Sequence, residues 1–232
     1  MKTISLLTLA LSLAVTFSAK ADEATDSAAK HIPAGLHDFT YKFKVDHFDH
    51  RPKTSGAIVM LGDSLTDLGG WSEYFPDRKI VNRGISGDNT FGIMQRVDQV
   101  IALRPSAIFL LAGTNDLFWG SPPEEVMKRY EELLNHLQAK LPLAKIVVQT
   151  VTPIVKKAGG DYGYLDNAKI EALNALLIAD AGNRRAQVVD LHSLFVKDGQ
   201  MDPDYTTDGI HLNGLAYDFW AAQVDRILQD VR

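Results

Sequence analysis

The sequence predicts a three-layer α/β/α sandwich around a central, mainly parallel sheet of five strands. Two observations lead to this fold class. Five short runs of apolar, mostly β-branched residues have no polar face, which is typical of strands that are covered on both sides in a parallel sheet. Helical patterns separate most of these runs from one another, and alternation of strands and helices favours an α/β fold.

The expected strands, in chain order, cover residues 57–61, 80–82, 107–111, 145–150 and 187–190. Apolar residues at three- and four-residue spacing predict helices over residues 89–103, 123–141, 165–181 and 214–231. The second of these helices has a well-marked start. Pro123 suits a first helical position, and Glu124 and Glu125 follow in the first turn, where negative charge is favourable.

The first 21 residues are typical of a secretory signal peptide. Lys2 supplies a positive start, an apolar run extends from Ile4 to Phe17, and Ala19-Lys20-Ala21 fits the small-x-small cleavage pattern. The run is shorter than the roughly 20 residues that span a bilayer. We therefore expect a cleaved signal peptide at 1–21, rather than a transmembrane anchor, and a periplasmic or secreted protein.

Residues 22–55 are expected to form an N-terminal extension, and residues 56–232 a single domain. Within the extension, Phe39, Tyr41, Phe43 and Val45 alternate with polar residues, which is the period of a half-buried strand. This segment is expected to add an edge strand or to drape over the domain.

Composition narrows the classes of partner. The chain is 46% hydrophobic and 23% charged, which indicates a globular protein, and its formal charge is −5. That charge gives no electrostatic support to a nucleic-acid or anionic-membrane partner. The absence of cysteine excludes disulfides and thiolate chemistry. We expect a small-molecule partner and no membrane span after signal cleavage; the sequence leaves the oligomeric state open.

Polar residues with glycine follow the first three strands and recur near the C-terminus. The segments are Gly62–Thr66, Arg83–Asp88, Ala112–Asp116 and Thr207–Asn213. Each is weak evidence alone, because Gly-Asp-Ser is also a turn and Asn-Asp is also a helix cap. In open α/β sheets, ligands bind beyond the carboxyl ends of the strands, so the joint occurrence of these segments predicts a site there.

These four segments resemble the four sequence blocks of the SGNH (GDSL) hydrolase superfamily, from about residue 57 to the C-terminus. Ser64 matches the serine of the first block, Gly87 the glycine of the second and Asn115 the asparagine of the third. Asp208 and His211 match the Asp-x-x-His of the last block. The resemblance implies a flavodoxin-like fold and a serine esterase with no cofactor and no metal.

The resemblance also implies a role for each matching residue. Ser64 is expected to be the nucleophile, His211 its general base and Asp208 the group that orients the imidazole. The backbone N–H groups of Ser64 and Gly87 and the side-chain amide of Asn115 are expected to form an oxyanion hole. Gly84 is the alternative to Gly87 as a donor.

Other polar and aromatic residues are given structural interpretations. His192 follows a strand and is expected to be a hydrogen-bonded structural histidine rather than a second base. His47 and His50 have a spacing that suits a metal, but no third ligand is near in the sequence, so a surface pair is expected. Phe118 and Trp119, just past Asn115, either line a substrate pocket or pack.

Three functions remain open at this level. The blocks at 82–87 and 112–116 look most like the platelet-activating-factor acetylhydrolase-like and acetylesterase branches of the superfamily. We therefore expect hydrolysis, through an acyl-enzyme, of small acyl (acetyl) esters of carbohydrates or similar alcohols. The alternatives are a lysophospholipase or thioesterase-type lipid acyl hydrolase and, from another class, a non-catalytic binding module.

Overall fold

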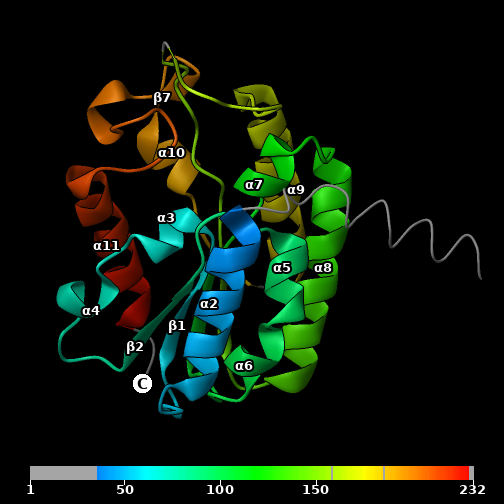
Figure 1. The fold of residues 1–232 in the computed structure, drawn as a ribbon, viewed down its shortest axis with the longest axis vertical. Helices are drawn as coiled ribbons and strands as arrows, with labels where there is room; N and C mark the ends of the chain where they lie inside the picture. Colours follow the sequence, from blue (N-terminus) through cyan, green and yellow to red (C-terminus); the bar gives the residue numbers. More distant parts are fainter. Residues whose placement is uncertain (1–35, 158, 185, 230–232) are drawn as a thin grey trace, which may run out of the picture.

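A computed structural model describes residues 36–157, 159–184 and 186–229 (Figure 1). Its centre is a five-stranded sheet in the order β2-β1-β3-β4-β5, with every pair parallel. The strands are β1 Ile58–Gly62, β2 Ile80–Gly84, β3 Ala107–Leu111, β4 Lys145–Gln149 and β5 Gln187–Val189. All five predicted strands are confirmed, and the order is that of a flavodoxin-like sheet. The expected signal peptide at 1–21 lies outside the described residues.

The register of the sheet brings three strand ends to one level. β1 lies between β2 and β3, and Gly62 at its end aligns with Gly84 of β2 and with Leu111 of β3. The segments that leave these strands therefore start side by side at the carboxyl edge. Three of the four predicted blocks are these segments.

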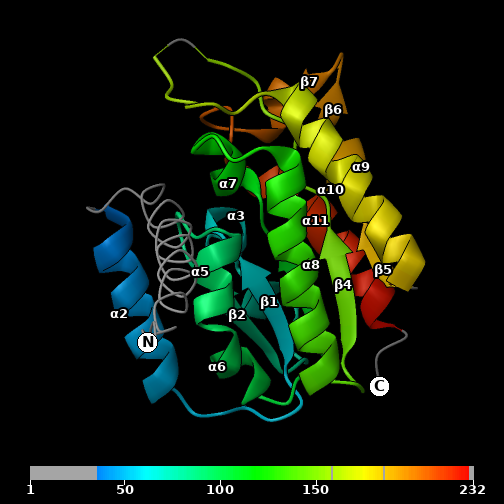
Figure 2. The ribbon, with the colours of Figure 1, turned by 90° about the vertical axis from the view of Figure 1, so that its right-hand side faces the viewer.

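Helices cover both faces of the sheet, which confirms the three layers (Figure 2). One face packs against α5 Thr90–Gln95, α6 Val97–Ile101, α8 Pro123–Lys140 and α9 Asn167–Arg184. The other packs against α3 Ser64–Asp67, α4 Trp71–Tyr74, α10 Leu191–Phe195 and α11 Gly214–Leu228. None of the helices in the described ranges combines the length and apolar character needed to cross a bilayer.

Alternation along the strands divides the core into two clusters. In β1, Val59 and Leu61 face the first set of helices, whereas Ile58 and Met60 face the second. Full burial of such side chains stabilises the fold by roughly 1.5–3 kcal/mol each.

The helix predicted over 89–103 is interrupted at Arg96. The residue has φ −115° and ψ 7°, and it separates α5 from α6. Its guanidinium turns into the core, donating to the Gly62 and Arg83 carbonyl oxygens and pairing with Asp88. A charged residue within an apolar stripe thus ends one helix and begins the next.

The strand predicted for residues 39–45 is wrong, because this segment belongs to helix α2, Leu36–His50. Half-buried side chains recur at Tyr41, Val45 and Phe48, which is helical spacing, while the two phenylalanines of the predicted strand are exposed. A helix pairs its own backbone N–H and C=O groups, whereas an added edge strand would leave a row of them unpaired.

Hydrogen bonds and an ion pair attach α2 to the domain. The Tyr41 hydroxyl donates to the Gly92 carbonyl oxygen of α5 at 2.7 Å, and Lys44 pairs with Asp67 of α3. The side-chain amide of Gln99 donates to a backbone carbonyl of α2 at 3.1 Å. The helix therefore drapes over the β2 edge of the sheet, beside α5 (Figure 1).

Candidate active site

Ser64 is the first residue of α3, two residues beyond the end of β1. Asp63 caps this helix by accepting a hydrogen bond from the Leu65 N–H at 3.0 Å. The turn from strand to helix is tight. A Cβ atom on Gly62 would lie 2.3 Å from the Leu111 carbonyl oxygen, so only glycine fits there. Ser64 is thereby held at the carboxyl edge of the sheet.

A continuous chain of hydrogen bonds joins three of the predicted site residues. His211 Nε2 lies 3.0 Å from Ser64 Oγ, and His211 Nδ1 lies 2.6 Å from Asp208 Oδ2. The other carboxylate oxygen of Asp208 accepts from the backbone N–H groups of Ile210 and His211, at 2.9 and 2.8 Å. Partial burial raises the pKa of Asp208, but the hydrogen bonds from His211 and Ile210 outweigh it and lower the pKa to about 2. An ionised Asp208 keeps the Nδ1 proton of His211, which leaves Nε2 free to accept a proton from Ser64.

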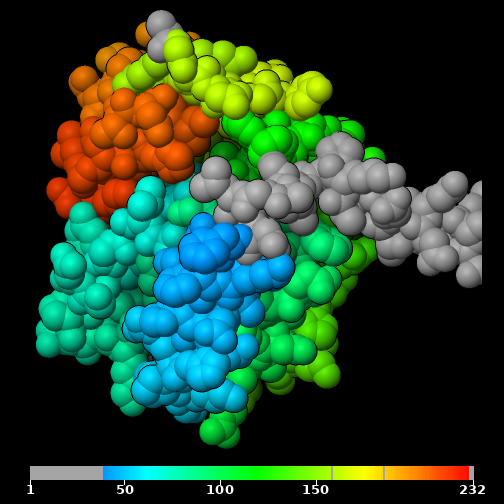
Figure 3. Space-filling view, in the orientation of Figure 1, coloured from blue at the N-terminus to red at the C-terminus, as the bar shows by residue number. Residues whose placement is uncertain are grey.

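The loop that carries Asp208 and His211 is fixed by local contacts. The Thr206 hydroxyl donates to the His211 carbonyl oxygen at 2.7 Å and accepts from the Gly209 N–H at 2.9 Å. The Val155 N–H donates to the Gly209 carbonyl oxygen at 3.0 Å. Gly209 has φ +99°, and a Cβ atom there would lie 2.2 Å from the Val155 carbonyl oxygen. In Figure 3 this segment, coloured orange, lies beside the cyan region of the chain that includes α3 and below the yellow-green loop that follows β4.

The helix that begins at Ser64, α3, and the helix that follows His211, α11, are also joined. α11, which begins shortly after His211, carries Tyr217, and the Tyr217 hydroxyl donates to the Leu65 carbonyl oxygen of α3 at 2.6 Å. The Trp71 indole N–H donates to the Thr66 carbonyl oxygen at 2.8 Å, and its ring lies 4.8 Å from that of Trp220 of α11, edge to face. These contacts hold α11 against α3.

The second block forms a turn that requires glycine at position 87. The Asp88 N–H donates to the Ile85 carbonyl oxygen at 3.0 Å, and Gly87 has φ +83° at the third position, as in a type II turn. The N–H of Gly84, the alternative donor, is already bound to Asn82 Oδ1 at 2.8 Å. No acceptor in the described part of the chain takes the N–H of Gly87, so Gly87 is the better placed of the two glycines.

Asn115 lies in the first turn of α7, Thr114–Phe118, just beyond β3. The N-cap of this helix is Gly113 with φ +120°, so Asn115 is not a helix cap. Its Nδ2 donates to the Asp88 carbonyl oxygen at 2.8 Å. An amide nitrogen carries two hydrogens, which leaves one for a ligand. The N–H of Ser64 also lacks an acceptor among the described residues.

Asp63, directly before Ser64, is fully buried. Burial raises the pKa of its carboxyl group to about 7, and the carboxylates of Asp88 and Asp116 add to the effect, although the Leu65 N–H opposes it. Asp63 Oδ2 has no hydrogen-bond partner among the described residues. Burial therefore favours the protonated form of this side chain, directly before Ser64 in the chain.

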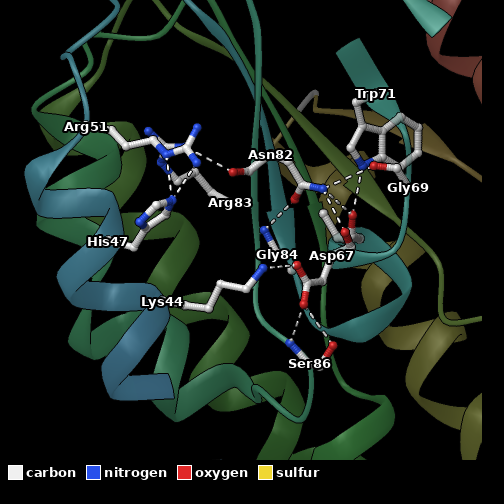
Figure 4. Close-up of polar contacts among 12 residues, drawn as sticks. Lys44, His47, Arg51, Asp67, Gly69, Trp71, Asn82, Arg83, Gly84 and Ser86 are labelled. Atoms are coloured by element: carbon white, nitrogen blue, oxygen red, sulfur yellow. Dashed lines mark hydrogen bonds and ion pairs between the residues drawn. The ribbon is translucent and has the colours of Figure 1, made fainter. Parts of the chain in front are cut away.

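Asp67 connects α3 to the turn that contains Gly87 (Figure 4). Its Oδ2 accepts from the backbone N–H and the hydroxyl of Ser86, at 3.2 and 2.8 Å, and its Oδ1 pairs with Lys44. Asn82 completes the connection from β2, because its amide donates to three backbone carbonyls at the end of α3, at 3.0, 3.0 and 3.2 Å. The serine and glycine blocks are thus joined by hydrogen bonds.

The sequence profile of the GDSL-like lipase/acylhydrolase family matches residues 60–219. The chain belongs to this family. GDSL-like acylhydrolases are carboxylic ester hydrolases, and the protein is an ester hydrolase of this type.

Two curated proteins and one solved structure illustrate the relationship. Platelet-activating factor acetylhydrolase IB subunit alpha1 of Pongo abelii is 28% identical over 185 residues, which cover 76% of this chain and 75% of that protein. The isoamyl acetate-hydrolyzing esterase 1 homolog of Rattus norvegicus is 25% identical over 191 residues, covering 70% and 77%. A GDSL-like lipase from Bacteroides thetaiotaomicron has the same fold, with a TM-score of 0.72 at 22% identity over 83% of this chain and 98% of that one.

Several residues that support this GDSL-like site were missed by sequence reasoning. Asp67 stands three positions after Ser64, and that Ser-x-x-Asp spacing indicates a helix start but not a bond to Ser86. Arg96 had a clearer signal, since it is a lone charge in an apolar helical stripe. It and Asp88 form a buried ion pair at 2.7 Å.

The remaining predicted residues lie apart from the hydrogen-bond chain of the GDSL-like site. His192 lies on α10, and the prediction that it is hydrogen-bonded is wrong for its Nε2, which has no partner among the described residues. Burial lowers the pKa of His192. His47, on α2, accepts a hydrogen bond from Arg51, which directly follows that helix. The described residues contain no group of three or more His, Cys, Asp or Glu side chains that could hold a metal ion.

Proposed function

We propose that this ester hydrolase removes small acyl groups, above all acetyl, from carbohydrates or similar alcohols through an acyl-enzyme on Ser64. The observation that carries the mechanism is the unbroken chain from Ser64 Oγ through both nitrogens of His211 to Asp208. A serine hydroxyl is a poor nucleophile until a base takes its proton, and this arrangement supplies that base with its tautomer fixed.

In the proposed reaction, Ser64 Oγ attacks the ester carbonyl carbon while His211 Nε2 takes the hydroxyl proton. The carbonyl oxygen becomes an oxyanion, and the N–H groups of Ser64 and Gly87 and the second amide hydrogen of Asn115 donate to it. The C–O bond to the alcohol then breaks, and His211 gives its proton to the departing oxygen. Water attacks the acyl-enzyme with His211 again as base, which releases the carboxylic acid and restores Ser64.

The choice of acetyl esters is supported by the names of two relatives, one an acetylhydrolase and the other an esterase that hydrolyses isoamyl acetate. Exposed aromatic rings support a carbohydrate as the alcohol. Trp119, one turn after Asn115, is 36% exposed, and Tyr164 is 67% exposed. The Tyr164 N–H donates to the Phe118 carbonyl oxygen at 2.9 Å, which keeps these aromatic residues together. Exposed aromatic surface of this kind marks binding sites, and its flat faces suit the apolar faces of sugar rings.

A panel of esters tests the substrate class. We expect kcat/KM on p-nitrophenyl esters to be highest for acetate and to fall steadily towards palmitate, and acetylated sugars to release acetate. Ser64→Ala, which should preserve the fold, is the control for chemistry that does not use the site. A maximum at palmitate would instead establish the lipid acyl hydrolase. Absence of both turnover and labelling by a fluorophosphonate would favour the binding module.

We also propose that the protein is exported and that its mature form begins close to Asp22, on the basis of the charge, apolar run and small-x-small pattern in residues 1–21. Fractionation of a bacterial host followed by N-terminal sequencing tests this. An intact Met1 on cytoplasmic protein would refute it.

A further inference from the structure

A cavity of about 540 Å³ lies between α2 and the β2 edge of the sheet, apart from the hydrogen-bond chain of Ser64. This volume is in the range of small-molecule sites, which is roughly 300–1,000 Å³. Its walls include Lys44 and His47 from α2, Arg51 directly after that helix, Arg83 from β2, and the ring of Phe48. Figure 4 shows the side chains of His47, Arg51 and Arg83 close together across this space.

Arg83 is the unusual member of the cavity wall, because its side chain is buried but has no ionic partner in the described ranges. The residue is only 6% exposed. Its Nη1 donates to the carbonyl oxygen of Asn82 at 3.0 Å, and its guanidinium lies 4.6 Å from the centre of the Phe48 ring. Burial lowers the pKa of Arg83, and the nearby charges of Arg51 and Arg96 lower it further. A buried charge without a counter-ion is costly, and a bound anion would remove that cost.

The other basic side chains make the cavity strongly positive. Arg51 Nε donates to His47 Nε2 at 2.8 Å. Lys44 is paired with Asp67, the one acidic side chain on the wall. Three cations therefore face one carboxylate, so the lining has a net charge of +2. Two arginines held next to each other in this way suit an anion that binds both.

We propose that this cavity is a binding site for a phosphate group, held by Arg51 and Arg83. A phosphate dianion balances the charge of the lining, whereas a carboxylate or a sulfate ester would leave half of it uncompensated. Guanidinium groups bind phosphate oxygens through paired, charge-assisted hydrogen bonds. The ring of Phe48, next to the Arg83 guanidinium, provides an apolar wall beside the charges. The ligand is accordingly a phosphomonoester with a small organic group rather than inorganic phosphate alone.

Isothermal titration calorimetry with phenyl phosphate, at constant ionic strength, tests the proposal. Each arginine is expected to make charge-assisted hydrogen bonds to the anion, so we expect Arg51→Gln and Arg83→Gln each to weaken phenyl phosphate binding by about tenfold or more. Arg226→Gln is the matched control, because Arg226 is exposed on α11 and contacts only Gln223 among the described residues. Circular dichroism confirms folding, and the exposed position of Arg51 keeps the test valid if Arg83→Gln unfolds.

Two further titrations identify what is recognised. Phenyl sulfate has the same shape with one charge fewer, and we expect it to bind at least tenfold more weakly than phenyl phosphate. Inorganic phosphate is expected to bind, but more weakly than the phenyl ester. The proposal is overturned if wild-type protein does not bind phenyl phosphate, or if Arg51→Gln binds it as tightly as Arg226→Gln does. Because binding is measured directly, the result is independent of esterase activity.

Discussion

Asn115 provides the sharpest test of the proposed oxyanion site, through Asn115→Asp and Asn115→Ala. Either change removes the amide hydrogen assigned to the oxyanion, and loss of one such donor lowers kcat by about 10²–10³, or roughly 2.7–4 kcal/mol of barrier. KM should change little, because the bond forms in the transition state. Asn115→Asp should be at least as damaging as Asn115→Ala, since it sets a negative charge beside the developing one.

The same substitutions have a separate, smaller effect on stability. Asn115 Nδ2 lies 2.8 Å from the Asp88 carbonyl oxygen and donates to it. An aspartate at position 115 would place a carboxylate oxygen, which is also an acceptor, against that carbonyl oxygen. An alanine would leave the carbonyl oxygen without its donor. Either change should cost about 1–3 kcal/mol of unfolding free energy, which is a shift of several degrees in Tm for a chain of this size. The loss of turnover is therefore expected to exceed what the loss of folded protein explains.

The assay measures kcat and KM on p-nitrophenyl acetate, with Tm from circular dichroism and active-site concentration from fluorophosphonate labelling. Asn174→Ala is the matched control, because the Asn174 amide also donates to a backbone carbonyl, that of Val151, at 2.8 Å. It should lower Tm without lowering kcat. A folded Asn115→Asp enzyme with more than about a tenth of wild-type kcat would refute the oxyanion assignment, given the 10²–10³ expected.

Three further predictions concern the residues around the nucleophile. Ser64→Ala and His211→Ala should each lower kcat by several orders of magnitude, and the double variant should be no worse than either, because the group acts as a unit; additive losses in kcat would contradict this. The pKa of Asp63 is raised from 3.8 to about 7, so the folded state keeps a proton that the unfolded chain has released, and wild-type stability falls as pH rises between these values. The asparagine of Asp63→Asn does not titrate. The unfolding free energy of this variant, measured in urea, should therefore rise relative to that of wild type by up to about 1.4 kcal/mol per pH unit between pH 4 and 7. If the unfolding free energies of the two proteins change with pH in the same way, Asp63 is not protonated in the folded state. Tyr217→Phe removes the hydrogen bond from the hydroxyl to the Leu65 carbonyl oxygen and should lower the unfolding free energy by about 1 kcal/mol or more. Its kcat should fall less than that of Ser64→Ala or His211→Ala. An unchanged Tm would show that this bond does not hold α11 on α3.

The strands and the residues of the hydrogen-bond chain could be predicted from sequence because their signals are local. A strand that is covered on both faces, such as β3, is a continuous apolar run. The glycine and polar residues of the next block follow it directly in the sequence. The parallel register then places the strand ends together without further information. The meeting of His211 with Ser64 was predicted only through the family resemblance, since no local pattern links a C-terminal loop to β1.

The N-terminal helix and the contacts around Asp67 could not be predicted in the same way. Residues 39–45 satisfy both a two-residue and a helical period, and the contacts of Tyr41 with α5 and of Lys44 with α3 belong to the folded arrangement. The bonds from Asp67 to Ser86 and from Tyr217 to Leu65 join residues far apart in the chain. Such pairings depend on tertiary structure, and nothing in either local sequence specifies its partner.

The distance in sequence between Ser64 and His211 has a consequence for how activity arises. The two residues are 147 positions apart, and they meet only when the segment before α11 has settled against α3. Chains are made from the N-terminus at about 5–20 residues per second, so the serine exists for seconds before its base does. During that interval it is an ordinary alcohol. On the proposed mechanism, a chain that stops short of this segment keeps its serine but is inert, so esterase activity would report that synthesis and folding have both passed His211.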